Sequence, residues 1–139
     1  MASPTLHRGI VFRAEHDSTF ESWGSEEPRA KFCVVFNAEP AIGDADVHYF
    51  MCTSKVARLR ETPSLHSDIL FLEAGAYACF SLETAIDFRT LYVVPLPKLI
   101  SHRMKIVGEL TPADVRRCEE IVATARVLEG RAKKLLGLR

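Results

Sequence analysis

Short apolar segments rich in β-branched and aromatic residues recur along most of this chain, and glycine, proline or charged residues separate them. Segments of this kind are typical of strands, which need only about four to eight residues each. The segments that we assign in this way cover residues 6–14, 31–37, 47–54, 68–74, 76–83, 84–96 and 105–110. Sequential short strands punctuated by turns predict a mainly β fold, in which about six strands form a small antiparallel barrel or closed sheet.

The last part of the chain predicts the best-defined element, a C-terminal α-helix. Thr111 is suited to cap this helix, and Pro112 fits its first position. Asp114 lies three residues after the cap, where its carboxylate can complete a capping box. Apolar residues then recur at spacings of three and four, which gives the helix one apolar face. That face consists of Val115, Cys118, Ile121, Val122, Ala125 and Leu128.

The length of 139 residues is that of one domain. We therefore expect a single domain over residues 1–139, with the barrel over about 6–110 and the helix over about 112–136. Basic and acidic residues number 18 each, so the formal net charge is zero and offers no global attraction for nucleic acid or an acidic membrane. The basic residues cluster late and the acidic residues early, which favours a polarised surface.

The four cysteines, Cys33, Cys52, Cys79 and Cys118, form no C-x-x-C pair and have no histidine at metal-binding spacing. Each lies in an apolar run, which predicts four buried thiols in a reducing compartment. The chain also has no signal-peptide pattern and no apolar stretch of the roughly 20 residues that span a bilayer. We therefore expect a cytoplasmic protein with no metal, no cofactor and no membrane contact.

No familiar enzyme motif is present, but two strand ends carry polar groups suited to a phosphate. Lys31 opens the most apolar segment, and a cation there can meet a phosphate oxygen. Thr53 and Ser54 end the next segment with two hydroxyls that can hold a phosphate or a ribose. The alternatives are a solvated strand-end lysine and hydroxyls that bond the adjacent turn. Five histidines are scattered along the chain and favour no catalytic role.

Residues 15–30 predict a long polar loop, of the length that is often functional or mobile. This loop holds His16, Phe20 and Trp23. Its aromatic rings either stack on ligands or pack the loop onto the barrel. Residues 55–64 are expected to form a loop or a short helical turn, and residues 97–103 a short helical turn.

The order of these segments resembles the MazF/PemK family of bacterial toxins. The resemblance rests on RGIVF at 8–12, KFCVVF at 31–36, HYFMCTS at 48–54 and GELTPADV at 108–115, with AGAYACFSLETAIDF at 74–88 similar to the later strands of the family. It covers about residues 6–128, and the GELTPADV helix start is its most specific part.

The resemblance implies an SH3-like barrel, usually a homodimer, that cleaves single-stranded RNA without a metal and is neutralised by an antitoxin protein. In that family an arginine at the start of the second strand and a threonine at the end of the next strand carry the reaction, which leaves a 2′,3′-cyclic phosphate. These positions fall on Lys31 and Thr53. Lysine departs from the family pattern, because it offers a point charge instead of a planar fork.

The resemblance also implies RNA-binding roles for residues around this pair. Arg29 lies two residues before Lys31 and could replace it if the strand register is shifted. Ser54 could contact phosphate or ribose, and His16 and Trp23 could stack on splayed bases. The alternatives are a catalytically inactive, toxin-like module that binds a protein target, and a structural homodimer with no ligand.

Overall fold

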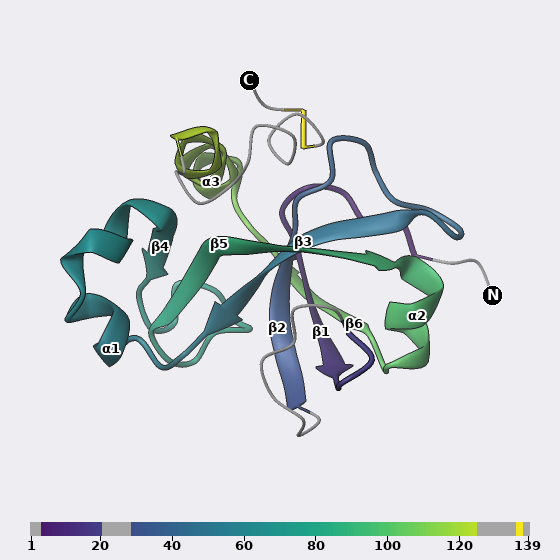
Figure 1. Cartoon of the computed structure of the whole chain (residues 1–139), viewed down its shortest axis with the longest axis horizontal. Coiled ribbons are helices and arrows are strands. Elements are labelled where there is room, and N and C mark those ends of the chain that lie inside the picture. Colours follow the sequence, from purple (N-terminus) through teal and green to yellow (C-terminus); the bar gives the residue numbers. More distant parts are fainter. Residues whose placement is uncertain (1–3, 21–28, 125–135, 138–139) are drawn as a thin grey trace.

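The computed structural model describes residues 4–20, 29–124 and 136–137. Within these residues, six strands form one antiparallel sheet that curls into a half-barrel (Figure 1). The strands are β1 (Ile10–His16), β2 (Arg29–Val35), β3 (Asp46–Thr53), β4 (Ile69–Leu72), β5 (Thr84–Pro95) and β6 (Lys105–Glu109), in the spatial order β4-β5-β3-β2-β1-β6. The helices are α1 (Ala57–Arg60), the 3-10 helix η1 (Pro63–Asp68), α2 (Leu96–Ser101) and α3 (Pro112–Thr124). This confirms the prediction of a mainly β chain with a C-terminal helix.

Some strand boundaries differ from those that the sequence predicted. Residues 76–83 do not form a strand, because Gly75 turns the chain at φ 77° and only the isolated pair Tyr77–Phe80 follows. β1 begins at Ile10, since Leu6 makes only a single bridge to Ala41. The strands also extend into both ends of the expected 15–30 loop. For the C-terminal helix, residues 125–135 lie outside the described residues.

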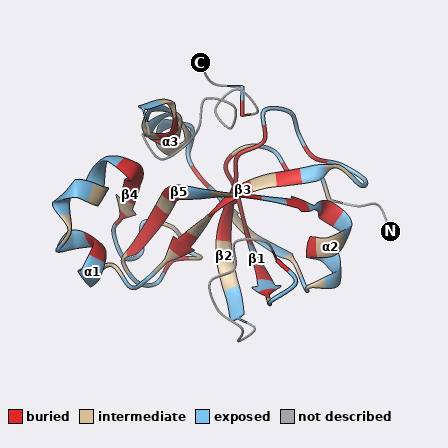
Figure 2. Ribbon diagram, in the orientation of Figure 1, coloured by how far each residue is buried: buried red, intermediate tan, exposed pale blue. Residues whose placement is uncertain are grey.

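Most residues of the central strands are buried (Figure 2), and their side chains enter two separate cores, one on each face of the sheet. On one face, α3 contributes Cys118 and Val122 to a core built around Phe36, Phe50 and Phe88. The other core is closed by α2 through Leu96 and Leu99, and it also contains Phe12, Cys33, Val35, Val47 and Tyr49. Alternate residues of β2 and β3 thus enter opposite cores, as period-two side-chain alternation requires. None of the helices within the described residues is long and apolar enough to cross a membrane.

The start of α3 confirms the predicted cap and adds a partner to it. The Thr111 hydroxyl accepts a hydrogen bond from the Asp114 backbone N–H at 3.2 Å. The Tyr77 hydroxyl accepts a hydrogen bond from the Thr111 backbone N–H at 2.9 Å and donates one to the Asp114 carboxylate. Asp114 therefore completes the cap through Tyr77 instead of bonding the Thr111 backbone directly. Val115 packs against the core beside buried Leu110, as expected for a hydrophobic staple.

Gly9 directly precedes β1 and lies against the start of α3, where a side chain would not fit. Its φ of 99° lies in the left-handed region, and a Cβ atom there would lie 2.8 Å from Val115 Cγ2. Its carbonyl accepts a hydrogen bond from the Leu110 backbone N–H at 2.8 Å. The backbone around Gly9 therefore cannot move aside without disturbing the start of the helix.

We predict that Gly9→Ala lowers the free energy of unfolding by about 2–4 kcal/mol, because backbone strain adds to overpacking. Gly43→Ala is the matched control, since Gly43 also has a positive φ, 63°, but nothing within 4 Å of an added Cβ. We expect that control to cost about 1–2 kcal/mol, from strain alone. Chemical denaturation of both variants measures the difference, and equal costs would contradict the predicted contact with Val115.

Candidate functional site

The ladder between β2 and β3 ends close to the two residues that the sequence predicted as catalytic. Its last pair is Cys33 with Met51. Lys31 lies two residues before Cys33 in β2, and Thr53 lies two residues after Met51 in β3. Side-chain alternation puts Lys31 and Thr53 on the face of Cys33 and Met51, while their neighbours Phe32 and Cys52 face the α3 core. Antiparallel pairing therefore brings two strand ends that are 22 positions apart in the sequence to the same end of the sheet.

Both residues line the same cavity, which has a volume of about 280 Å³. Its polar lining includes Lys31, Thr53, Ser54 and Lys55, and its apolar lining includes Phe32, Cys52, Cys79, Phe80 and Leu82. No acidic side chain among the described residues lines it. The cavity thus has cations and hydroxyls, with no described carboxylate at its wall to repel an anion.

Lys31 is half-buried and lies near two other cations. Burial lowers the pKa of its amine below the ordinary value of 10.5, and the charges of Arg29 and then Lys55 lower it further. Arg29 is exposed and does not line the cavity, although its charge reaches Lys31. An anion bound beside Lys31 would relieve the repulsion among these cations, so the electrostatics of the site favour a negatively charged ligand.

Within the described residues, the Thr53 hydroxyl takes part in one hydrogen bond, as an acceptor. Its oxygen accepts a hydrogen bond from the Lys55 backbone N–H at 3.1 Å. This is the turn contact expected of a strand-end hydroxyl, and it leaves the hydroxyl proton available to donate into the cavity. The same contact holds Lys55 close to Thr53. Ser54 lies between them, is exposed and also lines the cavity.

His16 lies elsewhere, in the core closed by α2, and is fully buried. Its Nδ1 lies 3.1 Å from the Ala14 carbonyl, which makes Nδ1 the donor, and its Nε2 accepts a hydrogen bond from the Tyr49 hydroxyl at 2.7 Å. Burial is the main cause that lowers the pKa of His16. The ring has no exposed surface on which a base could stack, so this placement does not fit the RNA contact expected from the sequence.

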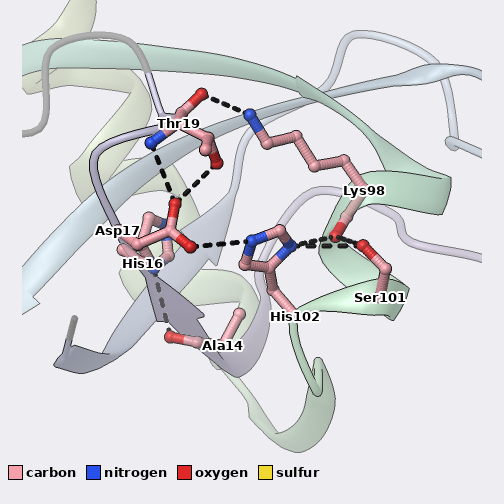
Figure 3. Close-up of polar contacts among 7 residues, drawn as sticks. All are labelled: Ala14, His16, Asp17, Thr19, Lys98, Ser101 and His102. Atoms are coloured by element: carbon pink, nitrogen blue, oxygen red, sulfur yellow. Dashed lines mark hydrogen bonds and ion pairs between the residues drawn. The ribbon is translucent and has the colours of Figure 1, made fainter.

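A polar cluster holds the chain after His16 against α2 (Figure 3). His102 lies 3.2 Å from the Asp17 carboxylate, and Lys98 donates a hydrogen bond to the Thr19 carbonyl. Phe20 is buried beneath these contacts, with the Lys98 amine 4.5 Å from its ring centre. For Phe20 the alternative of packing against the barrel is therefore confirmed. Trp23 lies outside the described residues.

Sequence reasoning missed two parts of the cavity. Lys55 directly follows Thr53 and Ser54, so its place in the sequence could have indicated that it lines the cavity. The wall formed by Cys79, Phe80 and Leu82 had no such signal, because the 76–83 segment resembles a strand in its composition. Leu82 is 62% exposed beside the cavity.

The cysteines are all free thiols. Cys33, Cys52 and Cys118 are buried as predicted, whereas Cys79 is only partly buried beside the cavity. Burial raises the pKa of the Cys118 thiol to about 12 and also raises the pKa of the Cys79 thiol. In the described part of the chain, no group of three or more His, Cys, Asp and Glu side chains is arranged to hold a metal ion.

Comparison with models of known protein families gave no match. Comparison with curated proteins gave no match either. Function is therefore inferred from the geometry and chemistry of the cavity, together with the order of sequence segments.

We predict that His16 makes the fold sensitive to acid. Its folded-state pKa lies below the ordinary 6.5, so as the pH falls below about 6.5 the unfolded chain takes up the proton first. The contribution of His16 to the free energy of unfolding is fully present above that pH. It is lost as the pH falls toward the folded-state pKa, by at most about 1.4 kcal/mol per pH unit. Denaturation of wild type and His16→Gln between about pH 7 and 5 should give a shallower slope for the variant. Identical slopes would contradict this role for His16.

Proposed function

We propose that this chain is a metal-independent endoribonuclease of single-stranded RNA and the toxin component of a toxin–antitoxin pair, with the SH3-like barrel of the MazF/PemK toxins. One observation carries the proposal: Lys31 and Thr53, from different strands, line one cavity with Lys55, and no described carboxylate lines it. Such a cavity suits a phosphodiester. In this proposal the protein acts in the cytoplasm, as a homodimer, and an antitoxin covers the cavity.

The proposed reaction uses the 2′-hydroxyl of RNA as the nucleophile. Its oxygen forms a bond to the adjacent phosphorus while its proton passes to water, and the bond from phosphorus to the 5′-oxygen breaks. The products are a 2′,3′-cyclic phosphate and a 5′-hydroxyl. DNA lacks the nucleophile and is therefore not cleaved.

In this mechanism, Lys31 and Thr53 act on the charge that develops at phosphorus. The Lys31 ammonium stabilises the pentavalent intermediate, and the Thr53 hydroxyl donates a hydrogen bond to a non-bridging oxygen. The lowered pKa of Lys31 makes its ammonium a better proton donor to the departing 5′-oxygen than an ordinary lysine. An arginine would bind the phosphate with two hydrogen bonds but would be a poor proton donor. Lysine therefore binds the phosphate less firmly but is the better general acid.

We predict that the purified protein cleaves a long single-stranded RNA into discrete fragments in the presence of EDTA. Lys31→Gln should lower the rate by about 10²–10³-fold, because it removes the charge at the phosphorane. Thr53→Val should lower it by about tenfold through loss of one hydrogen bond. Lys105→Gln is the matched control, since Lys105 is exposed on β6 and does not line the cavity.

The result that would contradict the nuclease is no cleavage by wild type at micromolar concentration. A stable complex with a protein target, unaffected by Lys31→Ala, would then favour the inactive binding module. Analysis of fragment ends adds a second test, because the mechanism requires cyclic phosphate at the 3′ end.

We also predict an alkaline loss of activity. The active form of Lys31 is the ammonium, and its pKa is lowered from 10.5, so activity falls as the pH rises through this lowered value. Lys31→Arg should be slower near neutral pH but should keep its activity to higher pH, because the guanidinium stays charged. The ratio of the two rates across pH measures the effect, and a constant ratio would show that Lys31 does not titrate in the reaction.

A further inference from the structure

A second hollow adjoins the cavity, and of its residues only Thr53 has a role in the proposed reaction. It has a volume of about 750 Å³ and is lined by Thr53, Lys55, Ala57, Arg58, Leu59, Asp87 and Arg89. Thr53 and Lys55 line both spaces. A chain-like ligand held beside Thr53 can therefore continue from one space into the other without leaving the surface.

The short helix α1 fixes one cation of this hollow in place. Leu59 is buried in a small core with Ile69 and Ala85, which anchors α1 against β4 and β5. The residue before it, Arg58, is exposed and lines the hollow. The residue after it, Arg60, has a structural role instead, because it pairs with Glu83 and lies 4.3 Å from the ring centre of Phe71.

The charges in this hollow are predominantly positive. Its one described acid is Asp87, which binds the Arg89 guanidinium at 2.9 and 2.7 Å and also accepts the Arg89 backbone N–H at 3.0 Å. Within the part of the chain that the structure describes, neither Lys55 nor Arg58 forms an ion pair. A chain with zero net charge thus has, at the lining of this hollow, two cations without an ion-pair partner among the described residues.

We propose that this hollow binds a second phosphate of the same RNA strand, on a nucleotide next to the scissile bond, with Arg58 as its main contact. The guanidinium of Arg58 offers the planar pair of donors that matches a phosphate, and Lys55 lies between the two phosphates. This inference rests on the proposed function, because it extends the path of the RNA from the same cavity. The ligand class is a single strand with more than one phosphodiester.

An acidic peptide would also be attracted to these cations, but the observations favour a nucleic acid. The two spaces share the Thr53 hydroxyl and Lys55, so both are suited to the same repeating group. A single-stranded backbone presents a phosphate at every nucleotide, and flexible strands follow such cationic grooves closely.

Binding of non-cleavable 2′-O-methyl oligonucleotides at several salt concentrations tests the proposal. A hexanucleotide should bind more tightly than a dinucleotide, which has a single phosphodiester. Arg58→Gln should lower the affinity for the hexanucleotide about tenfold, because one charged contact is lost, and should lower the affinity for the dinucleotide far less. It should also reduce the slope of log affinity against log salt by about 0.7. Arg58→Lys should keep the slope but not the full affinity, and Lys105→Gln should change neither.

The outcomes separate this subsite from the nuclease. If Arg58→Gln lowers the affinity for both oligonucleotides equally, the second phosphate site is overturned even if RNA is cleaved. The same holds if the variant binds both as tightly as wild type does and its thermal unfolding is unchanged. The predicted pattern without any RNA cleavage would keep the subsite and overturn the nuclease. A polyglutamate peptide that competes as well as the hexanucleotide would assign the hollow to an acidic protein and overturn the proposal.

Discussion

The burial of β2 and β3 on both faces of the sheet is the constraint on which the rest of this structure depends. Val34 enters the core beneath α3, while its neighbours Cys33 and Val35 enter the core closed by α2. A strand buried on both sides tolerates few polar side chains, since each would need a buried partner. Lys31 and Thr53 accordingly lie toward the ends of these strands. Beyond the end of the ladder at Cys33 and Met51, Lys31 and Thr53 line the same cavity.

The local balance of charge at that strand end matters more than the charge of the whole chain. A net charge of zero predicted no global attraction for nucleic acid, but locally Arg29 and Lys55 lie close enough to Lys31 to lower its pKa. Such crowding costs stability in the free protein and is relieved when an anion binds, so the site is suited to a phosphate before any ligand arrives. Asp87 does not neutralise it, because its carboxylate is already held by Arg89.

The sequence predicted those parts of the molecule that depend on neighbours in the chain. The strands and the α3 cap follow from local alternation and from Thr111. The choice of Lys31 and Thr53 as site residues stays a prediction, which follows from their place at the polar ends of apolar strands. It did not predict the burial of His16, because the partner that makes burial possible is the Tyr49 hydroxyl, 33 positions away. The two hydrogen bonds that the buried His16 ring makes cannot be inferred from the presence of a histidine at that position. Residues 76–83 were predicted to form a strand because their apolar composition is that of a strand and does not show that the chain turns after Gly75.

That turn links the cavity to the C-terminal helix. Tyr77, two residues after Gly75, completes the cap of α3. Cys79 lies close to β6, because a Cβ atom added to Gly108 would be 3.1 Å from the Cys79 sulfur. Phe80 follows and enters the core that α3 covers. The apolar wall of the cavity is thus fixed from both sides, by the cap of the helix and by β6. The start of α3, which does not line the cavity itself, therefore helps to fix the wall that lies across the space from Lys31 and Thr53.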